Sequence, residues 1–540
     1  MKTKRIIMGL SLSFILTGLV FVTGGKTAAN PQVLGAFDPP FIWPSARTAI
    51  PVWMTADRYG TVPPMDKTYI LNFWAGHYDL LLDGQPYDEV KAINPNIRNL
   101  SPGSLSYFTM YTRPEYSTGE HYWGGIGELK TWVEAHWQEY AWASQFTDAA
   151  EAFEDCFIHV NQEVTASFVK TTEEYIIPAY DPANPKLSRL PGPWDIDYDW
   201  MMNVGSPVYI SFWQDYYMQQ LGAQATEGVF LDSTGSGWIH LWVGPTKTVE
   251  YNTNDDDTAS RLTFTNDIRS LTASVQAGLQ SSYPDKKLAI NDYNTFEANV
   301  TPKMLDFQNQ ADILWRENGI HNNRTSTDMK NEIEADIRAT EAGKIVVLDQ
   351  SVELCSSVIY CGNSDVSYEP WNDPACMACV DQERRAGLAA YYQVMNDNIY
   401  FSSVVDLFFA KFPFHEEDPA IYAWYDAMGY DIGQPVSGFN SDWAHGQDPS
   451  QPGLTYYVFA REYTDALVLF KAKPAGSPTH GVYGANSETI HQLDAAYRPL
   501  KPDGTLGDPV TSVTLRNWDG AILIKPDTTP PAAVNDLSGD

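Results

Sequence analysis

Basic residues are scarce in this chain. Its 540 residues include 35 Lys and Arg against 68 Asp and Glu, which gives a formal net charge of -33 at pH 7. Such a surface repels phosphate groups, so it argues against a nucleic-acid partner and against adhesion to anionic membranes. The charge balance instead fits a protein that works outside the cell on neutral or cationic partners.

Long apolar runs are also scarce, since only the segment from Ile6 to Val22 qualifies. Three cations precede it, Lys2, Lys4 and Arg5, and the small residues Thr27-Ala28-Ala29 follow it. This pattern predicts a signal peptide over residues 1–29, with an uncleaved membrane anchor as the alternative. Without a second run of that length, we expect a secreted or cell-surface protein with no membrane insertion after signal removal.

Cysteines are few, but four of the five fall in one short segment. These are Cys355, Cys361, Cys376 and Cys379. In an exported protein they predict a disulfide-stapled loop, for which three pairings are open. The alternative is that Cys376-Met-Ala-Cys379 forms half of a zinc site or a redox pair. Cys156 would remain a buried free thiol.

Several catalytic and cofactor motifs are absent. The sequence has no Gly-x-Ser-x-Gly elbow, no His-Glu-x-x-His zinc helix and no Gly-x-Gly-x-x-Gly opening a helix. These absences disfavour a serine hydrolase, a zinc protease and a dinucleotide enzyme, and we predict no cofactor and no catalytic metal. The acidic run Asn254–Asp257 leaves a structural calcium site open, but it lacks the spacing of an EF-hand loop. A solvated acidic loop is the favoured interpretation.

The chain does contain many short apolar runs. Many of these runs are followed by a polar tip and then by a helical stretch. Strand, polar tip and helix in alternation are typical of a parallel sheet. The sequence therefore predicts an α/β fold, a (β/α)8 TIM barrel over residues 67–430, with a doubly wound open sheet as the alternative. An extended N-terminal segment over 30–66 would cover it. The eight predicted strands are Tyr78–Leu82, Leu105–Tyr111, Cys156–Val160, Val229–Leu231, Leu288–Ile290, Ile313–Trp315, Ile345–Leu348 and Phe401–Phe409.

The pattern changes to short strands and tight turns near residue 450. Leu454–Ala460 and Ala466–Lys471 are strand candidates, and Asp519-Gly520 predicts a hairpin turn after Val513–Leu515. We expect a small all-β domain of the β-sandwich type over 450–526. Residues 527–540 would be a Pro-rich linker that leads into a truncated tail like the start of a fibronectin III module.

Polar residues follow several of the predicted strands. In a barrel these strand ends share one face, so Asp232, Asn291, Glu317 and Asp349 should converge there. Cleavage of a glycosidic bond needs two carboxyl groups about 5–9 Å apart, one to attack or activate water and one to protonate the leaving oxygen. Asp232 and Glu317, after strands four and six, are the predicted catalytic pair. Arg316 should point away from Glu317 if the strand persists.

Other residues near the strands predict substrate contacts through hydroxyl binding or ring stacking. For each of them a core, surface or loop-holding role is the alternative. They are His77, Tyr78, Trp238, Asn291, Asp292, Trp315 and Asp349.

The order of these motifs resembles a hypothetical glycoside-hydrolase-like family of TIM barrels, distantly similar to polygalactosaminidase and α-galactosidase barrels. The resemblance rests on Tyr78–Leu82, Ile93-Asn-Pro-Asn96, Phe157-Ile-His159, Phe212-Trp213, Glu227–Asp232 and Trp315-Arg-Glu317. It implies a carbohydrate substrate, with Asp232 as nucleophile and Glu317 as acid/base. The chain departs from the family in its Cys-rich insertion between strands seven and eight and in Cys156, where an aromatic residue is expected.

Three hypotheses follow. The first is an exported glycoside hydrolase that cleaves a polysaccharide or oligosaccharide with two carboxylates. The second is a non-catalytic carbohydrate-binding or surface-structural protein on the same scaffold. The third is a redox or metal protein that uses the cysteine cluster.

Overall fold

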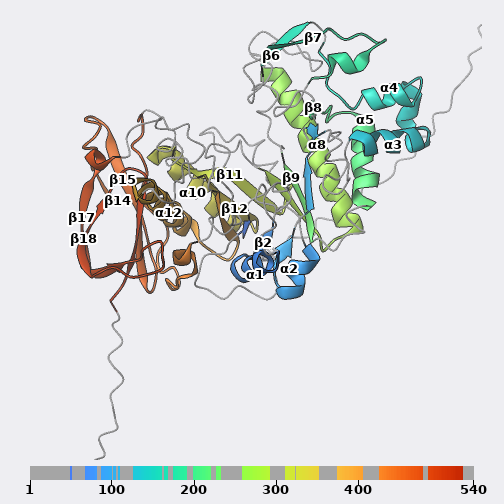
Figure 1. Ribbon diagram of the computed structural model, residues 1–540. Coiled ribbons are helices and arrows are strands. Elements are labelled where there is room, and N and C mark those ends of the chain that lie inside the picture. Colours follow the sequence, from blue (N-terminus) through green and yellow to red (C-terminus); the bar gives the residue numbers. More distant parts are fainter. Residues whose placement is uncertain are drawn as a thin grey trace, which may run out of the picture.

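The fold is described from a computed structural model (Figure 1). The predicted signal segment and the C-terminal tail lie outside the described residues. The structure describes residues 49–50, 67–81, 87–99, 101–104, 107–109, 126–160, 163–167, 174–190, 199–219, 227–232, 258–291, 310–322, 324–351, 374–404, 425–477 and 484–526.

Parallel strands form a ring in chain order. A six-stranded sheet has the order β13-β12-β11-β10-β9-β4, and a second sheet has the order β1-β2-β3. β3 pairs with β2 and β4 pairs with β9, and only one residue separates β3 from β4 in the sequence, so these two strands link the two sheets. Because β1 lies beside β13, the ring closes as the predicted (β/α)8 barrel. The strands are β1 (Ala49–Ile50), β2 (Leu80–Leu81), β3 (Arg98–Asn99), β4 (Ser101–Ser104), β9 (Gly228–Asp232), β10 (Lys287–Asn291), β11 (Ile313–His321), β12 (Ile345–Ser351) and β13 (Ile399–Val404).

Helices alternate with these strands and lie outside the ring (Figure 1). They are α1 (Lys67–His77), α2 (Tyr87–Ile93), α8 (Thr258–Ser282), α10 (Ser326–Glu341) and α12 (Pro374–Val394). The sequence of α10 accounts for its start and its orientation. Thr325 and Asp328 form a reciprocal capping box at its amino end, and the buried face of the helix packs toward the sheet. Among the described residues no helix combines the length and apolarity needed to span a bilayer.

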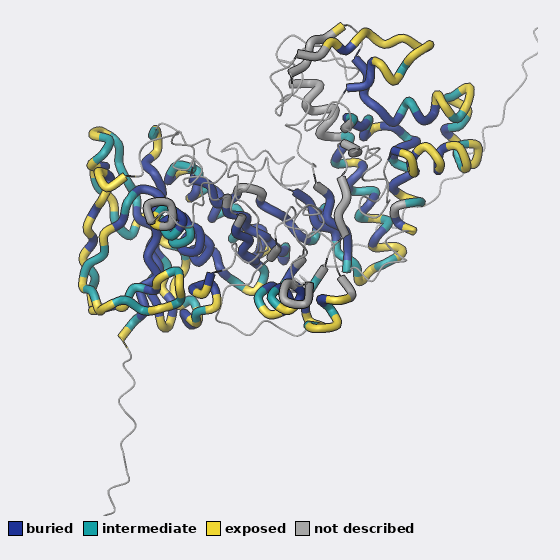
Figure 2. Tube along the Cα trace, in the orientation of Figure 1, coloured by how far each residue is buried: buried dark blue, intermediate teal, exposed yellow. Residues whose placement is uncertain are grey.

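Strand residues alternate between the inside of the ring and the layer beneath the helices, as the two-residue period of a strand requires. Figure 2 shows the central strands as the most deeply buried part of the molecule. Side chains inside the ring form one cluster: Leu80, Phe230, Ala289, Ile313, Trp315, Ile345, Val347 and Tyr400. Their strand neighbours face outward into the larger core: Val229, Leu231, Leu288, Ile290, Leu314, Val346 and Leu348.

A lobe is inserted between β4 and β9 (Figure 1). Two of the predicted barrel strands fall in it, and both assignments are wrong. Tyr107–Thr109 of the predicted second strand pairs antiparallel with Asp199–Met201, and Cys156–Val160 makes only isolated bridges. Cys156–Val160 are all buried, and their apolar residues belong to the larger core, which accounts for the apolar run. Its elements are β5 (Tyr107–Thr109), α3 (Ile126–His136), α4 (Ala149–Glu154), β6 (Val164–Ser167), β7 (Glu174–Ile177), β8 (Asp199–Met201) and α5 (Pro207–Phe212).

The predicted all-β region forms one antiparallel sheet of order β14-β15-β16-β19-β17-β18. It curls around its own apolar cluster, while α12 packs against its other face. The predicted hairpin at Asp519-Gly520 is wrong, because both residues belong to β19, which pairs with β16 and β17 rather than with β18. The strands are β14 (Asn440–Gln447), β15 (Thr455–Glu462), β16 (Ala466–Lys471), β17 (Thr489–Pro499), β18 (Val510–Leu515) and β19 (Asp519–Ile524).

The thiols differ in part from expectation. Cys156 is a buried free thiol, as predicted. Cys379 lies on α12 and is also free, so the predicted four-cysteine staple is not found at this position. Cys355 and Cys361 lie outside the described residues.

Candidate functional site

The carboxyl ends of the barrel strands bring several of the predicted site residues to one edge of the sheet. Asp232 is the last residue of β9 and Asn291 the last residue of β10. Leu231 pairs with Ile290, one residue before each of these ends, and Asn291 pairs with Trp315 of β11. Asp232, Asn291 and Trp315 are therefore contributed by three adjacent strands at closely similar heights.

Glu317 lies within a strand rather than beyond its end. The predicted strand six stopped at Trp315, but β11 continues to His321. Its pairing with β12 shifts register between Arg316 and Ile320, so Glu317 lies in an irregular, bulged stretch. Bulges occur beside active sites, where they redirect a side chain. The structure describes the backbone of Asp232 and Glu317 but not their side chains.

Arg316 faces away from the inside of the ring, as the strand alternation predicts. It is 1% exposed, and its Nε donates a hydrogen bond to Oδ1 of Asp336 on α10 at 2.9 Å. Glu332 lies one helical turn before Asp336 and is buried as well. Burial raises the pKa of both carboxyl groups, well above the ordinary value for Glu332, and the Arg316 guanidinium opposes the rise at Asp336.

Sequence reasoning missed this buried cluster of acids behind β11. The available signal was the four-residue spacing of Glu332 and Asp336 on the same face of α10 as the apolar Met329 and Ile333.

Asn291, Asp349 and Trp315 are all buried. The Trp315 ring packs edge-on against Phe230 inside the barrel, with centroids 5.1 Å apart. This placement favours the core role for Trp315 that the sequence left open. Asp349 lies on β12 two residues beyond the inward-facing Val347, and it pairs with Ser402 of β13. Asn291 and Asp349 thus provide buried polar groups toward the carboxyl end of the barrel.

His77 and Tyr78 lie elsewhere. They precede β2, so they are at the amino end of that strand, whereas the other predicted site residues are at the carboxyl ends. His77 ends α1, its ring stacks on Phe73 at 4.0 Å, and Tyr78 is buried. The structure therefore does not bring these two residues together with Asn291 and Asp349. Trp238 and Asp292 lie outside the described residues.

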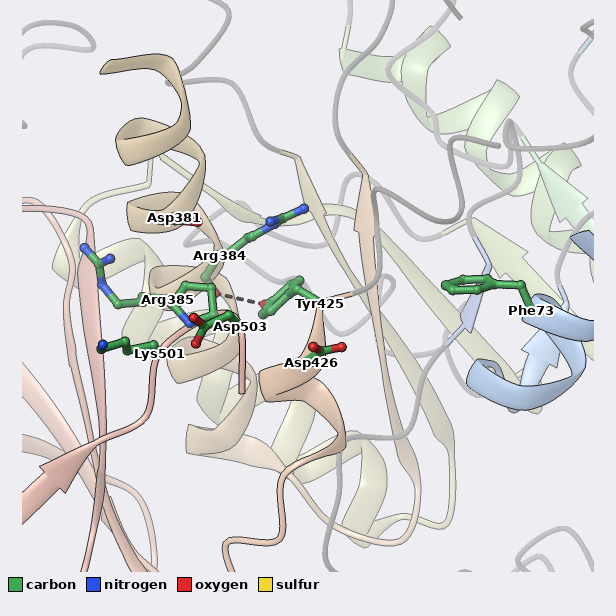
Figure 3. Close-up of a pocket in the computed structure, with 9 residues that line it drawn as sticks. Phe73, Asp381, Arg384, Arg385, Tyr425, Asp426, Lys501 and Asp503 are labelled. Atoms are coloured by element: carbon green, nitrogen blue, oxygen red, sulfur yellow. Dashed lines mark hydrogen bonds between the residues drawn. The ribbon is translucent and has the colours of Figure 1, made fainter. Parts of the chain in front are cut away.

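A polar pocket of about 540 Å³ lies outside the strand ring (Figure 3). It is lined by residues of α1, α12, the short 3-10 helix η8 (Asp426–Gly429) and the 501–503 loop. Its cations and carboxylates are balanced, and Tyr425 donates its hydroxyl to the backbone oxygen of Arg384 at 2.9 Å. No predicted site residue is among its lining residues, so it is separate from the strand-end site.

Comparisons with known proteins give only distant similarities. No protein-family model matches the chain, and no curated protein matches it. Among solved structures, Eubacterium rectale Amy13B is 9% identical, with a TM-score of 0.43 over 92% of this chain and 98% of that one. An α-amylase from Geobacillus thermoleovorans complexed with acarbose is 10% identical, with a TM-score of 0.37 over 90% of this chain and 99% of that one.

A GH31 dextranase from Flavobacterium johnsoniae complexed with glucose is 10% identical, with a TM-score of 0.34 over 90% of this chain and 52% of that one. These scores are low, so the barrel assignment rests on the order and direction of the strands described above.

Proposed function

We propose that this protein is an exported glycoside hydrolase whose reaction takes place at the carboxyl ends of the barrel strands. Asp232 and Glu317 would supply its two carboxyl groups. The observation that supports this pair is their position, since Asp232 ends the fourth strand of the ring and Glu317 follows Trp315 on the sixth. Each of the two directly follows a strand residue that faces outward: Asp232 follows Leu231, and Glu317 follows Arg316.

The two roles follow from the chemistry of glycoside cleavage. Asp232 would attack the anomeric carbon, while Glu317 protonates the oxygen of the departing sugar as that bond breaks. Glu317 would then remove a proton from water, which attacks the same carbon and releases Asp232. If the carboxyl groups stand farther apart, Asp232 would instead activate water in a single inverting step.

Two buried polar residues extend the proposed site. Asn291 is paired with Trp315, and Asp349 lies one strand beyond β11. We assign them to holding sugar hydroxyls or the catalytic carboxyls, because both are polar residues near the carboxyl ends of the barrel strands, where barrel enzymes bind their substrates. The strongly negative charge of the chain is compatible with a neutral sugar substrate. Export rests on the signal-peptide pattern at the N-terminus.

The test is turnover by Asp232→Asn and Glu317→Gln on a panel of polysaccharides and aryl glycosides. We expect each variant to lose at least about 1000-fold in kcat, because each change removes a group that acts in the transition state. Asp442→Asn, which changes an exposed carboxylate of β14, is the matched control and should leave kcat unchanged. Turnover like that of the wild type in either Asp232→Asn or Glu317→Gln would refute the pair. Glycan binding without any turnover by the wild type would instead support a non-catalytic carbohydrate-binding protein.

A further inference from the structure

The irregular stretch of β11 is held against one face of α10. On the amino side of this stretch, Nε of Arg316 donates a hydrogen bond to Oδ1 of Asp336 at 2.9 Å, and both side chains are 1% exposed. On its carboxyl side, Ile320 resumes pairing with Gln350 of β12. The bulge between these two points therefore spans a short distance fixed at both ends.

At Gly319 the backbone of the bulge lies close to the Glu332 side chain. A Cβ at Gly319 would lie 2.9 Å from Cβ of Arg316, 3.1 Å from its backbone oxygen and 3.3 Å from Oε1 of Glu332. No side chain fits there without a shift of the strand or of Glu332. The same helix face thus contacts the bulge beside Arg316 and again at Gly319.

The Glu332 carboxyl is an unusual group to bury at this place. Neither of its oxygens has a hydrogen-bond partner among the described residues, and the residue is 5% exposed. An ionised carboxylate in that setting is unfavourable, and burial raises the pKa of Glu332 accordingly. Burial and the nearby Asp336 favour the neutral form of this carboxyl, while the charges of Arg324 and Arg316 oppose them. The neutral form adds no second negative charge beside Asp336.

We propose that Arg316, Asp336 and Glu332 form a clamp that fixes the bulge and so positions Glu317 for the proposed reaction. They are positioning residues, since they act through the backbone of β11 from the side opposite the barrel interior. The inference rests on the proposed function, because it takes Glu317 to be the acid/base.

Kinetics of clamp variants test the proposal. Arg316→Met should lower kcat about 10–100-fold with KM within about 3-fold of the wild type, because a misplaced acid/base affects the transition state more than substrate binding. Glu332→Gln has the shape and neutrality of the protonated acid and should stay within about 2-fold of the wild type in kcat. Glu332→Ala should lower kcat, so that glutamine but not alanine preserves the rate.

Two control variants separate positioning from stability. Ile333→Val truncates a buried residue on the same helix, and Lys330→Ala removes an exposed pair with Glu334. Both should leave kcat of the folded protein unchanged. If Ile333→Val lowers kcat as much as Arg316→Met at equal folded fraction, the clamp is only structural and the proposal is wrong. Equal rates in Glu332→Ala and the wild type would also overturn it.

Amide hydrogen exchange gives a readout that needs no substrate. Exchange of a peptide covering Glu317–Ile320 should speed up at least about 10-fold in Arg316→Met and Glu332→Ala, and should not change in Ile333→Val. If the wild type hydrolyses no glycoside while this exchange pattern holds, the proposed function fails but the clamp stands. Unchanged exchange in both clamp variants would refute the clamp itself. If Arg316→Met does not fold, the kinetic and the exchange measurements are both made on Glu332→Ala.

Discussion

Replacing Glu383 by alanine should destabilise the protein more than any surface charge mutation. Glu383 is a fully buried residue of α12 that joins the barrel to the C-terminal sheet. Its Oε2 accepts a hydrogen bond from Nε1 of Trp518 at 2.6 Å, and its Oε1 accepts one from Nδ2 of Asn322 at 3.1 Å. Asn322 follows β11 directly, and Trp518 lies in the turn before β19.

The magnitude follows from these two bonds. Glu383→Ala leaves two buried donors without this acceptor, at about 1–3 kcal/mol each, and loses about 1 kcal/mol of packing. Allowing for relaxation and water entry, we expect a loss of about 3–5 kcal/mol in the free energy of unfolding. Glu383→Gln keeps the shape and one acceptor oxygen but sets its amide NH2 against the other donor, so it should cost about 1–3 kcal/mol.

Urea unfolding followed by tryptophan fluorescence measures these losses. Glu488→Ala is the control, because Glu488 pairs with Arg516 at a half-exposed site, where an ion pair contributes about 0–1 kcal/mol. The ranking should be Glu383→Ala, then Glu383→Gln, then Glu488→Ala. A Glu383→Ala loss no larger than that of the control would refute the idea that this carboxyl joins the two parts.

Three further predictions concern the bulge and the thiols. Gly319→Ala should lower the urea midpoint and kcat together, because the new methyl group would press on Arg316; unchanged values would contradict the tight approach. Burial raises the pKa of Glu332 in the folded protein above its ordinary 4.5. Protonation of Glu332 therefore stabilises the folded state fully below pH 4.5, and this stabilisation is lost as the pH rises toward the folded pKa. The stability of Glu332→Gln relative to the wild type should therefore increase as the pH rises above 4.5, and a pH-independent difference would count against this. A maleimide should modify the partly exposed Cys379 in the native protein and reach the buried Cys156, whose pKa burial raises, only after unfolding; peptide mapping checks the order, and the reverse order would exclude it.

The sequence predicted the later strands of the barrel well because they are buried on both faces. Val229–Leu231, Leu288–Ile290 and Ile345–Leu348 are continuous apolar runs, and each lies within a strand of the ring. β4 was missed because Ser101-Pro-Gly-Ser104 has no apolar run, although its backbone pairs with β9 over its whole length. β1, with only two residues, offered no pattern to read.

The site was predicted in part for the same reasons. Strand alternation correctly placed Arg316 on the side opposite the barrel interior. His77 was placed with the site because its strand was expected to begin at Tyr78, whereas α1 runs through His77. The buried Glu332 and Asp336 were missed because acidic residues on a helix ordinarily face water, and only the packing of α10 on β11 reveals their burial.

The separation of the Asp232 and Glu317 carboxyl groups, measured in crystals of the protein, tests the proposed site most directly. We predict a distance of about 5–5.5 Å for a retaining enzyme or about 6.5–9.5 Å for an inverting one, with both groups open to the same hollow. A separation well beyond about 10 Å, or either carboxyl turned away from that hollow, would contradict the two-carboxylate site.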